Sequence, residues 1–183
     1  TLTLSAGTNA TMRTFVRSAT IGTTRTLTCA AVAALTDIDF RDVIIAGAAA
    51  PVSGTRLGDC QGNSGIVFDA PKTVYRRNAT STLWESTTGW SLTVGGTADV
   101  TYFPLAQDTA VFPSAYPNSG VSTNLSIPYN IGSIDLSART TNTFTISNSA
   151  ATQIYGSLTI GTGVTISGTI TMSFVGRTLQ SIT

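Results

Sequence analysis

Short apolar–threonine–apolar triplets in the last third of the chain restrict its possible folds most. The triplets are Leu158–Ile160, Val164–Ile166 and Ile170–Met172. In extended backbone, each triplet places two apolar side chains on one face and a threonine on the other. Glycine or Ser-Gly lies between the triplets, and such residues form turns. Because Thr, Val and Ile pack well on a pleated surface and lose rotamer freedom in a helix, the pattern predicts short β-strands joined by turns.

The same region repeats itself at an interval of about 20 residues, the length of one coil in several solenoid folds. Thr143–Ser147 is echoed by Gly163–Ser167, and Ile154–Gly156 is echoed by Phe174–Gly176. In a parallel β-helix, each coil leaves its backbone groups unpaired until the next coil stacks on it. We therefore predict an all-β protein, with a parallel β-helix or β-solenoid favoured. A jelly-roll-like β-sandwich built from hairpins is the alternative that two copies of a repeat leave open.

A phase break in the segment Thr36–Gly47 indicates a corner in the backbone. Ile38 and Phe40 share one face, whereas the next apolar pair, Val43 and Ile45, falls on the opposite face of a straight strand. A corner near Arg41–Asp42 brings both pairs to one interior, as at the corners of a β-solenoid. A bulged strand in a sandwich produces the same break.

The chain contains three regions of different composition, and they define its expected division into domains. Residues 1–78 form a Thr- and Gly-rich β-solenoid region, and residues 130–183 form solenoid coils that are expected to continue beyond the chain end. Residues 79–129 are richer in aromatic residues and contain four prolines, which confine strands to edges and starts. We interpret residues 79–129 as an irregular insertion with a hairpin across Val94–Thr97.

The sparse charge excludes several classes of partner. Charged residues make up 10% of the chain against about 25% in typical soluble domains, and the formal net charge is +1. Ser and Thr, about three residues in ten, supply the polar surface instead. The basic residues are scattered, without the basic stripe that nucleic-acid binding needs, so no nucleic-acid partner is expected. The most apolar stretch, Val43–Val52, is half the roughly 20 residues of a membrane span, and none is expected.

The sequence also argues against catalysis, cofactors and metals. The chain has no histidine, which rules out Ser-His-Asp and Cys-His sites within it. Because it also has no Cys-x-x-Cys pair, no zinc site is expected. The glycine-rich segment Gly54–Gly65 lacks the Gly-Lys-Ser/Thr sequence of a phosphate-binding loop. We therefore predict no enzymatic activity, no cofactor and no metal.

A set of aspartates in the first third of the chain is the strongest catalytic candidate that the sequence offers. Asp37 and Asp39 lie on one strand face, and Asp42 and Asp59 are available to join them. Glycosidases use two such carboxyl groups. Against this reading, Arg41 on the same face offers a surface ion pair, and Asp is common at strand ends and turns.

Three further residue sets have a functional and an ordinary interpretation. Trp84 and Trp90 are candidates for glycan contact, or else they form the core of the irregular region. Cys29 and Cys60 are candidates for a disulfide, or else they are two buried thiols. The glycosylation sequons at Asn9, Asn78 and Asn124 are also expected by chance in so Thr-rich a chain.

Several stretches resemble parts of large phage virion and tail proteins with β-helical stalks. The stretches are Asp37–Gly47, Gly54–Cys60, Gly62–Ile66, Lys72–Tyr75, Gly89–Gly96 and Phe103–Thr109. The resemblance spans about residues 26–183. It implies a structural component of a tail fibre, spike or virion surface that gives rigidity and host attachment. The implied partners are two further copies of the chain in a trimer, other virion proteins and a cell-surface glycan. No catalytic residue is implied.

Two other functions remain open from the residues. One is a secreted or surface-bound bacterial β-solenoid adhesin, with an extracellular or cell-surface location. The other is a polysaccharide-degrading β-helix enzyme. Because the alternating pattern of Leu179–Thr183 has no polar cap, we expect either a segment of a longer protein or a subunit whose end a neighbour covers. Homotypic association follows from that expectation.

Overall fold

The protein is all-β in the computed structural model, as the sequence predicts. The structure describes residues 1–4, 10–77, 83–114, 121–125, 129–140, 144–148, 151–166 and 171–183. Within these ranges the regular elements are short β-strands and one 3₁₀ turn, Val100–Tyr102. No helix of the described residues has the length and apolar character that crossing a membrane requires.

The chain divides into two compact units, Thr1–Ala70 and Pro71–Thr183, and each has a hydrophobic core of its own. The predicted boundary between residues 78 and 79 lies outside the described residues. The aromatic segment predicted as an insertion supplies core residues to the second unit, where Trp84, Trp90 and Phe112 pack with Ile134 and Leu136. It is therefore part of that core.

The described residues of the first unit contain seven strands in three small sheets. The strands are β1 (Thr14–Arg17), β2 (Arg25–Thr28), β3 (Leu35–Thr36), β4 (Ile38–Arg41), β5 (Val43–Ala46), β6 (Gly54–Thr55) and β7 (Gly58–Asp59). The sheets have the orders β1-β4-β7, β2-β5 and β3-β6, and every pairing in them is parallel. Paired residues lie between 18 and 24 positions apart, as with Arg25 and Val43 or Thr14 and Ile38.

The corner predicted near Arg41–Asp42 lies at Asp42. This residue has a φ of 60° and separates β4 from β5, which belong to different sheets. As a result, Ile38 and Phe40 share one core with Val43 and Ile45. The change of direction resolves the break in the apolar pattern.

Left-handed corners recur at the same place in successive passes of the chain. Asp37 and Arg56 both have positive φ, 56° and 53°, and they directly follow the paired residues Thr36 and Thr55. Asp42 likewise has its counterpart at Gln61, with a φ of 68°, and the Asp42 N–H donates to the Gln61 carbonyl. Non-glycine residues adopt this conformation at a cost of about 1–2 kcal/mol. The surrounding strand pairing must therefore impose it.

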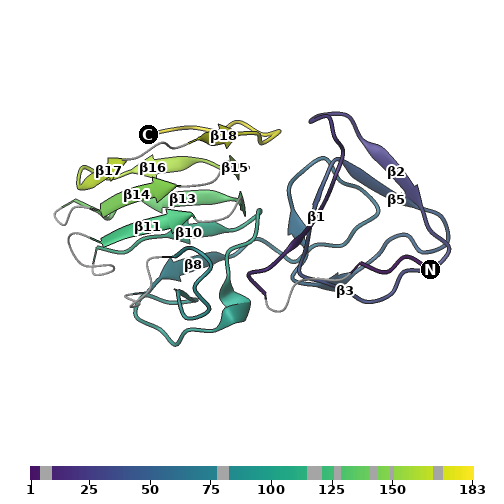
Figure 1. The fold of residues 1–183 in the computed structure, drawn as a ribbon, viewed down its shortest axis with the longest axis horizontal. Coiled ribbons are helices and arrows are strands. Elements are labelled where there is room, and N and C mark those ends of the chain that lie inside the picture. The colour runs from purple at the N-terminus through teal and green to yellow at the C-terminus, as the bar shows by residue number, and fades with distance from the viewer. Residues whose placement is uncertain are drawn as a thin grey trace. The chain divides into compact units, whose positions relative to one another are not determined.

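The second unit contains eleven described strands. They are β8 (Thr73–Arg76), β9 (Trp90–Ser91), β10 (Thr109–Val111), β11 (Val121–Leu125), β12 (Asn130–Ile131), β13 (Ser133–Leu136), β14 (Phe144–Asn148), β15 (Thr152–Ile154), β16 (Leu158–Ile160), β17 (Val164–Ile166) and β18 (Met172–Phe174). The sheet orders are β16-β13-β10-β8-β9, β11-β14-β17 and β12-β15-β18. Within this unit the strands lie in stacked rows (Figure 1).

Parallel pairing dominates the second unit too. Of its described pairings only β8 with β9 is antiparallel. Two of the predicted triplets are strands β16 and β17. The third begins at Ile170, outside the described residues, and β18 starts at Met172. The expected hairpin across Val94–Thr97 is not formed, because the preceding strand β9 pairs with β8 and the described residues directly after the turn form no strand.

A serine ladder links successive passes of the second unit at an interval of 24 residues. Ser133, Ser157 and Ser181 occupy equivalent places at the starts of three paired segments. The Ser157 N–H donates to Ser133 Oγ, and the Ser181 N–H donates to Ser157 Oγ, both at 3.1 Å. The interval differs from the echo of about 20 residues noted in the sequence, which belongs to the pairs β14–β17 and β15–β18.

Candidate functional site

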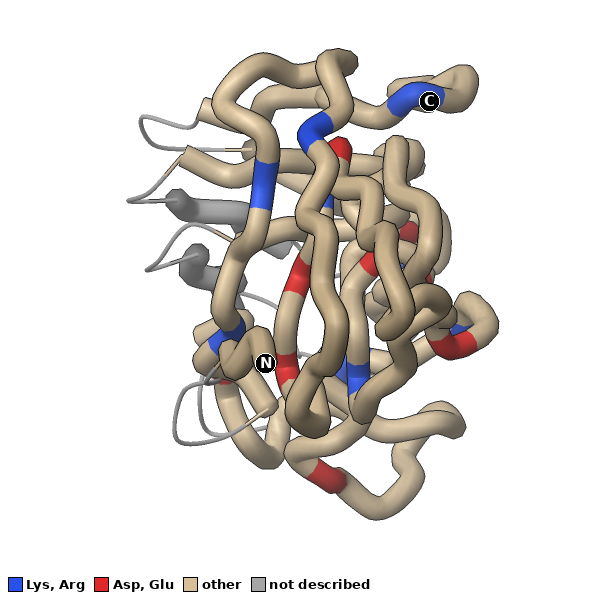
Figure 2. The backbone as a smooth tube through the Cα atoms, turned by 90° about the vertical axis from the view of Figure 1, so that its right-hand side faces the viewer, with Lys and Arg blue, Asp and Glu red and all other residues tan. Residues whose placement is uncertain are grey.

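A cluster of four charged side chains in the first unit is the strongest candidate site. Charged residues are sparse along the chain (Figure 2), so their grouping here is informative. Arg13 lies directly before β1, Asp37 and Asp39 flank the start of β4, and Arg56 lies between β6 and β7. The side chains of Arg13, Asp37 and Asp39 are only 4–5% exposed, and that of Arg56 is 23% exposed.

The two arginines bind both carboxylates at close range. Arg56 donates from Nε and Nη2 to the two oxygens of Asp37, each at 2.7 Å, in a bidentate arrangement. Arg13 donates from Nε to Asp39 Oδ1 at 2.7 Å and from Nη1 to Asp37 Oδ1 at 3.4 Å. Arg13 Nη2 also donates to the Arg56 carbonyl oxygen at 2.7 Å.

Strand register brings these residues together. Thr14 pairs with Ile38, so Arg13 lies beside Asp37, and the β3–β6 register places Asp37 beside Arg56. One corner therefore carries a positive, a negative and a positive side chain in three successive passes of the chain. Gly58, the partner of Asp39, leaves room for the cluster because a Cβ there would overlap the Asp39 carboxylate.

The charges within the cluster neutralise one another. Two guanidinium groups balance two carboxylates, and the carboxylate oxygens already accept charge-assisted hydrogen bonds. Hydrolysis of a glycosidic bond requires one protonated carboxyl and one available carboxylate with space for the sugar between them. The predicted pair of Asp37 and Asp39 is thus brought together, but as part of an ion cluster.

Two sequence-based expectations about this region are wrong. Asp37, Asp39 and Arg41 were expected on a solvent-facing strand surface, yet their exposed fractions are only 2–3%. Arg41 is buried and offers no surface ion pair: its Nε lies 3.7 Å from Asp42 Oδ2, and its Nη2 donates to the Ser18 carbonyl. Asp59, the remaining candidate, accepts hydrogen bonds from Gln61 N and Asn63 Nδ2.

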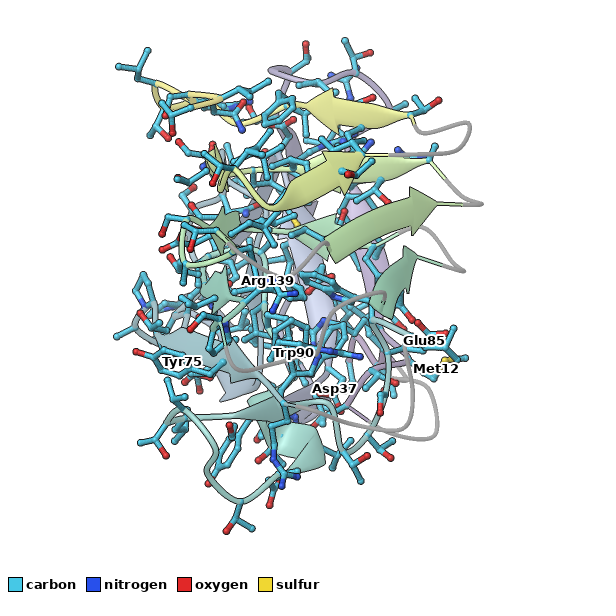
Figure 3. The ribbon with its side chains drawn as sticks, turned by 90° about the vertical axis from the view of Figure 1, so that its left-hand side faces the viewer. Met12, Asp37, Tyr75, Glu85, Trp90 and Arg139 are labelled. Carbon is cyan, nitrogen blue, oxygen red and sulfur yellow. The ribbon has the colours of Figure 1, made fainter. Side chains whose placement is uncertain are left out.

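Trp84 and Trp90 form the core of the second unit and present no platform to a sugar ring. Their exposed fractions are 2% and 1%, and their ring centroids lie 4.8 Å apart. Both rings also contact Phe112, and Trp90 Nε1 donates to the Trp84 carbonyl at 2.9 Å. Figure 3 shows Trp90 surrounded by other side chains. The glycan-contact prediction is therefore replaced by its alternative, core packing.

A buried arginine accompanies this aromatic core. Arg76 lies with its guanidinium carbon 5.2 Å from the centroid of Trp90 and donates from Nη2 to the Leu83 carbonyl. Desolvation lowers the pKa of Arg76 to about 10, and the charge of Glu85 acts in the opposite direction. Burial raises the pKa of the Tyr129 phenol above its usual range, and Glu85 adds to that shift.

No disulfide joins Cys29 and Cys60, although both cysteines of the chain lie in the described residues. Cys29 directly follows β2 and its N–H donates to Ala46, whereas Cys60 follows β7 and its N–H donates to Phe40. Since β2 and β7 belong to different sheets, the register separates the two residues. The structure therefore has the predicted alternative of two thiols, of which Cys60 is buried.

The remaining candidates add no chemistry. The described residues contain no group of three His, Cys, Asp or Glu side chains suited to a metal. A shallow groove of about 600 Å³ in the first unit is lined by Ala31–Leu35, Ala49 and Pro51–Thr55, none of them titratable. The sequons at Asn9 and Asn78 lie outside the described residues, and Asn124 lies in β11, where side chains are not described.

Comparison of the chain with protein families, curated proteins and solved structures finds no match. Function must therefore be inferred from the chain's own residues.

Proposed function

We propose that this chain is a non-catalytic β-solenoid segment of a surface assembly, with a virion tail or spike favoured. The observation that carries the proposal is the pairing pattern. In both units, strands pair in parallel with strands one pass of about 20 residues later, and a β-sandwich would require antiparallel hairpins instead. The solenoid architecture is itself part of this proposal.

The mechanical role follows from how successive coils hold one another. Each coil donates and accepts backbone hydrogen bonds along the stacking direction, and the serine ladder adds further bonds along the same direction. Such a stack resists bending and stretching because deformation breaks many parallel bonds together. Four charged groups of the first unit, those of Arg13, Asp37, Asp39 and Arg56, pair with one another, and Ser and Thr supply much of the chain's polar surface.

The virion assignment rests on the resemblance of six stretches to phage virion and tail proteins. Low charge and an inward-directed ion cluster agree with a supporting element better than with a catalytic one. Self-association and contact with other proteins of the assembly are part of the proposal. The proposal assigns host attachment to surface residues other than Trp84 and Trp90, which are buried.

A register-specific disulfide tests the architecture. Asp135 and Thr159 are parallel partners on β13 and β16 and are both partly exposed. Neighbouring strands lie about 4.8 Å apart, within disulfide reach, so Asp135→Cys with Thr159→Cys should cross-link on mild oxidation. The background carries Cys29→Ser and Cys60→Ala.

The matched control moves one cysteine two positions along the strand, as Ser133→Cys with Thr159→Cys. This adds roughly 6.6 Å along the strand and exceeds disulfide reach. Cross-linking of the control pair, or failure of the in-register pair, would reject stacked parallel coils.

The functional part is tested with glycans and with particles. The protein is incubated with acidic and neutral polysaccharides, and release of reducing or unsaturated ends is measured. No release is expected, and release above a blank would overturn the non-catalytic proposal. Antibodies raised against the chain should label the outside of virions from its source by electron microscopy; labelling of cells only would favour an adhesin.

A further inference from the structure

A surface loop of the first unit departs from the regular stacking of the chain. Strand β1 pairs with β4 up to the last residue of each, and β2 pairs with β5 from the first residue of each. The seven residues 18–24 of one pass therefore lie opposite the single residue Asp42 of the next. Residues 19–24 are all exposed. They project from the corner between β1 and β2.

Two buried side chains hold the base of this loop. Asp42 Oδ2 accepts a hydrogen bond from the Gly22 N–H at 2.9 Å, and Arg41 Nη2 donates to the Ser18 carbonyl at 3.2 Å. Asp42 and Arg41 are 0% and 2% exposed, and Arg41 Nε lies 3.7 Å from Asp42 Oδ2. A loop that is fixed in this way loses little conformational entropy when it binds a partner.

The loop presents an isoleucine to solvent. The Thr23 N–H donates to the Thr20 carbonyl, and Gly22 has a φ of 85°, as the third residue of a type II turn requires. Ile21 occupies the second position, at the tip of the turn, and is 46% exposed. Residues 18–24 contain no charged side chain. The tip is therefore an uncharged, apolar projection.

The same unit contains a groove of matching character, with a volume of about 600 Å³. It is lined by uncharged and mostly small residues of two successive passes, 31–35, 49 and 51–55. The two passes are joined on either side of it, where the Ala49 N–H donates to Cys29 and where Leu35 pairs with Gly54. Clefts of roughly 300–1,000 Å³ hold drug-sized ligands, so the groove has room for the tip of a turn.

A copy of the chain does not place its own loop in its own groove. The four residues of β2, beside β5, separate the loop from the groove by roughly 13 Å (Figure 1). The bond from Gly22 to Asp42, directly before β5, holds the tip of the loop at its corner. The occupant of the groove must therefore be another molecule.

The exposed charges of the unit indicate which molecule this is. In its described part, the exposed charged side chains are those of Arg17, Arg25 and Asp69. Arg17 and Arg25 directly flank the loop. Asp69 lies three residues, or at most roughly 10 Å, beyond Ile66, which forms a bridge with Val52 in the groove. Positive charge thus accompanies the loop, and negative charge accompanies the groove.

We infer that the loop of one copy of the chain docks in the groove of another copy. The inference rests on the self-association that the proposed function includes, and it names the two surfaces that meet. A second copy fits better than an unrelated partner because each copy carries both halves with opposite charges beside them. Since the halves are different surfaces, the contact is head-to-tail and closes into a ring or continues as a filament.

Two variants disable the two halves separately. Ile21→Asp places a charge at the tip, and Ala34→Arg puts a long positive side chain at an exposed position of the groove. In sedimentation at micromolar concentration, the wild type should exceed its monomer mass of 18.9 kDa, and each variant should remain at that mass. The control Leu92→Asp makes the same change at a matched exposure of 45% in the second unit and should assemble like the wild type.

A mixture of the two variants tests the head-to-tail geometry. Ile21→Asp retains an intact groove and Ala34→Arg retains an intact loop, so the mixture should form a one-to-one complex with twice the monomer mass. This complex forms only if both variants are folded. A monomeric wild type, assembly of either variant alone, dissociation by Leu92→Asp, or a monomeric mixture would each overturn the inference.

Charge reversal provides an independent check. Arg17→Asp with Arg25→Asp, or Asp69→Arg alone, should weaken assembly about tenfold, because like charges then meet beside the loop and the groove. Combining all three substitutions restores opposite charges and should recover most of the wild-type affinity. A combined variant that assembles no more tightly than Asp69→Arg alone would contradict the contact.

The register disulfide distinguishes this inference from the proposed architecture. If Asp135→Cys and Thr159→Cys cross-link while the wild type is monomeric, the loop contact is wrong and the architecture stands. If that cross-link fails while the mixture of Ile21→Asp and Ala34→Arg forms its complex, the architecture is wrong and the loop contact stands.

Discussion

Arg13 is the residue on which the buried ion cluster of the first unit depends. It contacts Asp39, Asp37 and the Arg56 carbonyl, and its side chain is 5% exposed. A buried charge left without its partner is costly, because neither water nor a counter-ion replaces the lost bonds. The cluster therefore stabilises the fold only as a complete set.

Arg13→Ala is expected to lower the free energy of unfolding by about 3–5 kcal/mol. The matched control is Arg17→Ala at the end of β1, which removes an exposed arginine beside Phe15 and should cost less than about 1 kcal/mol. Urea denaturation monitored by circular dichroism measures both. If Arg13→Ala lowers the free energy of unfolding no more than Arg17→Ala does, and by less than about 1 kcal/mol, the buried cluster adds no stability.

Tyr129 makes the stability of the folded protein depend on pH in the alkaline range. Its pKa is raised in the folded protein by burial and by the charge of Glu85. An unfolded tyrosine ionises near pH 10, so above that pH the unfolded state binds fewer protons than the folded state. The stability contributed by neutral Tyr129 is complete below about pH 10 and is lost as pH rises beyond it.

Tyr129→Phe is expected to unfold with a smaller loss of stability between about pH 9 and pH 11 than the wild type. Arg76 acts in the opposite direction, because its pKa is lowered to about 10 and the unfolded state holds its proton longer. Arg76 and the other tyrosines are common to both proteins, so the comparison isolates Tyr129. Urea titrations across this range make the measurement, and parallel curves for the two proteins would refute it.

At the scale of elements, Asp108 connects the segments that precede β8 and β10. Its side chain accepts from Lys72 N, Lys72 Nζ and Leu105 N at 2.8–3.0 Å and is fully buried. Beside it, the Thr109 N–H donates to the Lys72 carbonyl. One carboxylate thus aligns the starts of two parallel strands that are distant in sequence.

Asp108→Asn should cost about 1.5–3 kcal/mol, because an amide has one acceptor oxygen and no charge for Lys72. Asp135→Asn changes a partly exposed aspartate that caps only Ser137 N, and should cost less than about 1 kcal/mol. Hydrogen exchange at Thr109 reports the effect locally. Unchanged exchange there in Asp108→Asn would show that the carboxylate does not align the strands.

Elements were predicted unequally well, for physical reasons. Strands β16 and β17 and the corner at Asp42 follow from local alternation, since side-chain direction in a strand depends only on neighbouring residues. The intervals of 24 and 19 residues that place Arg13 and Arg56 on either side of Asp37 are long-range registers. Local patterns carry no information on such registers, so the burial of Asp37 and Asp39 was not predicted.

At the scale of the whole molecule, the chain holds two cores that share no residue. One contains Ile38, Phe40 and Val43, and the other contains Trp84, Trp90 and Leu136. Strand pairing also stays within each unit, because no sheet of the described residues contains strands of both.

A fragment of residues 71–183 is therefore expected to fold alone, with one cooperative thermal transition and dispersed amide resonances. The matched fragment, residues 1–70, is smaller and buries a smaller share of its surface, so it should melt at a lower temperature. Loss of structure in the 71–183 fragment would show that its core requires the first unit.

The amino-acid sequence alone determined the β class, the turns and the low charge, because rotamer preference, alternation and composition act within a few residues. The lack of histidine likewise excluded imidazole chemistry. Only the tertiary structure decided which strands are neighbours and which charges meet. It made Asp37 and Asp39 an ion cluster, Trp84 and Trp90 a core, and Cys29 and Cys60 separate thiols. Those outcomes depend on the partner that each residue acquires roughly 20 positions away.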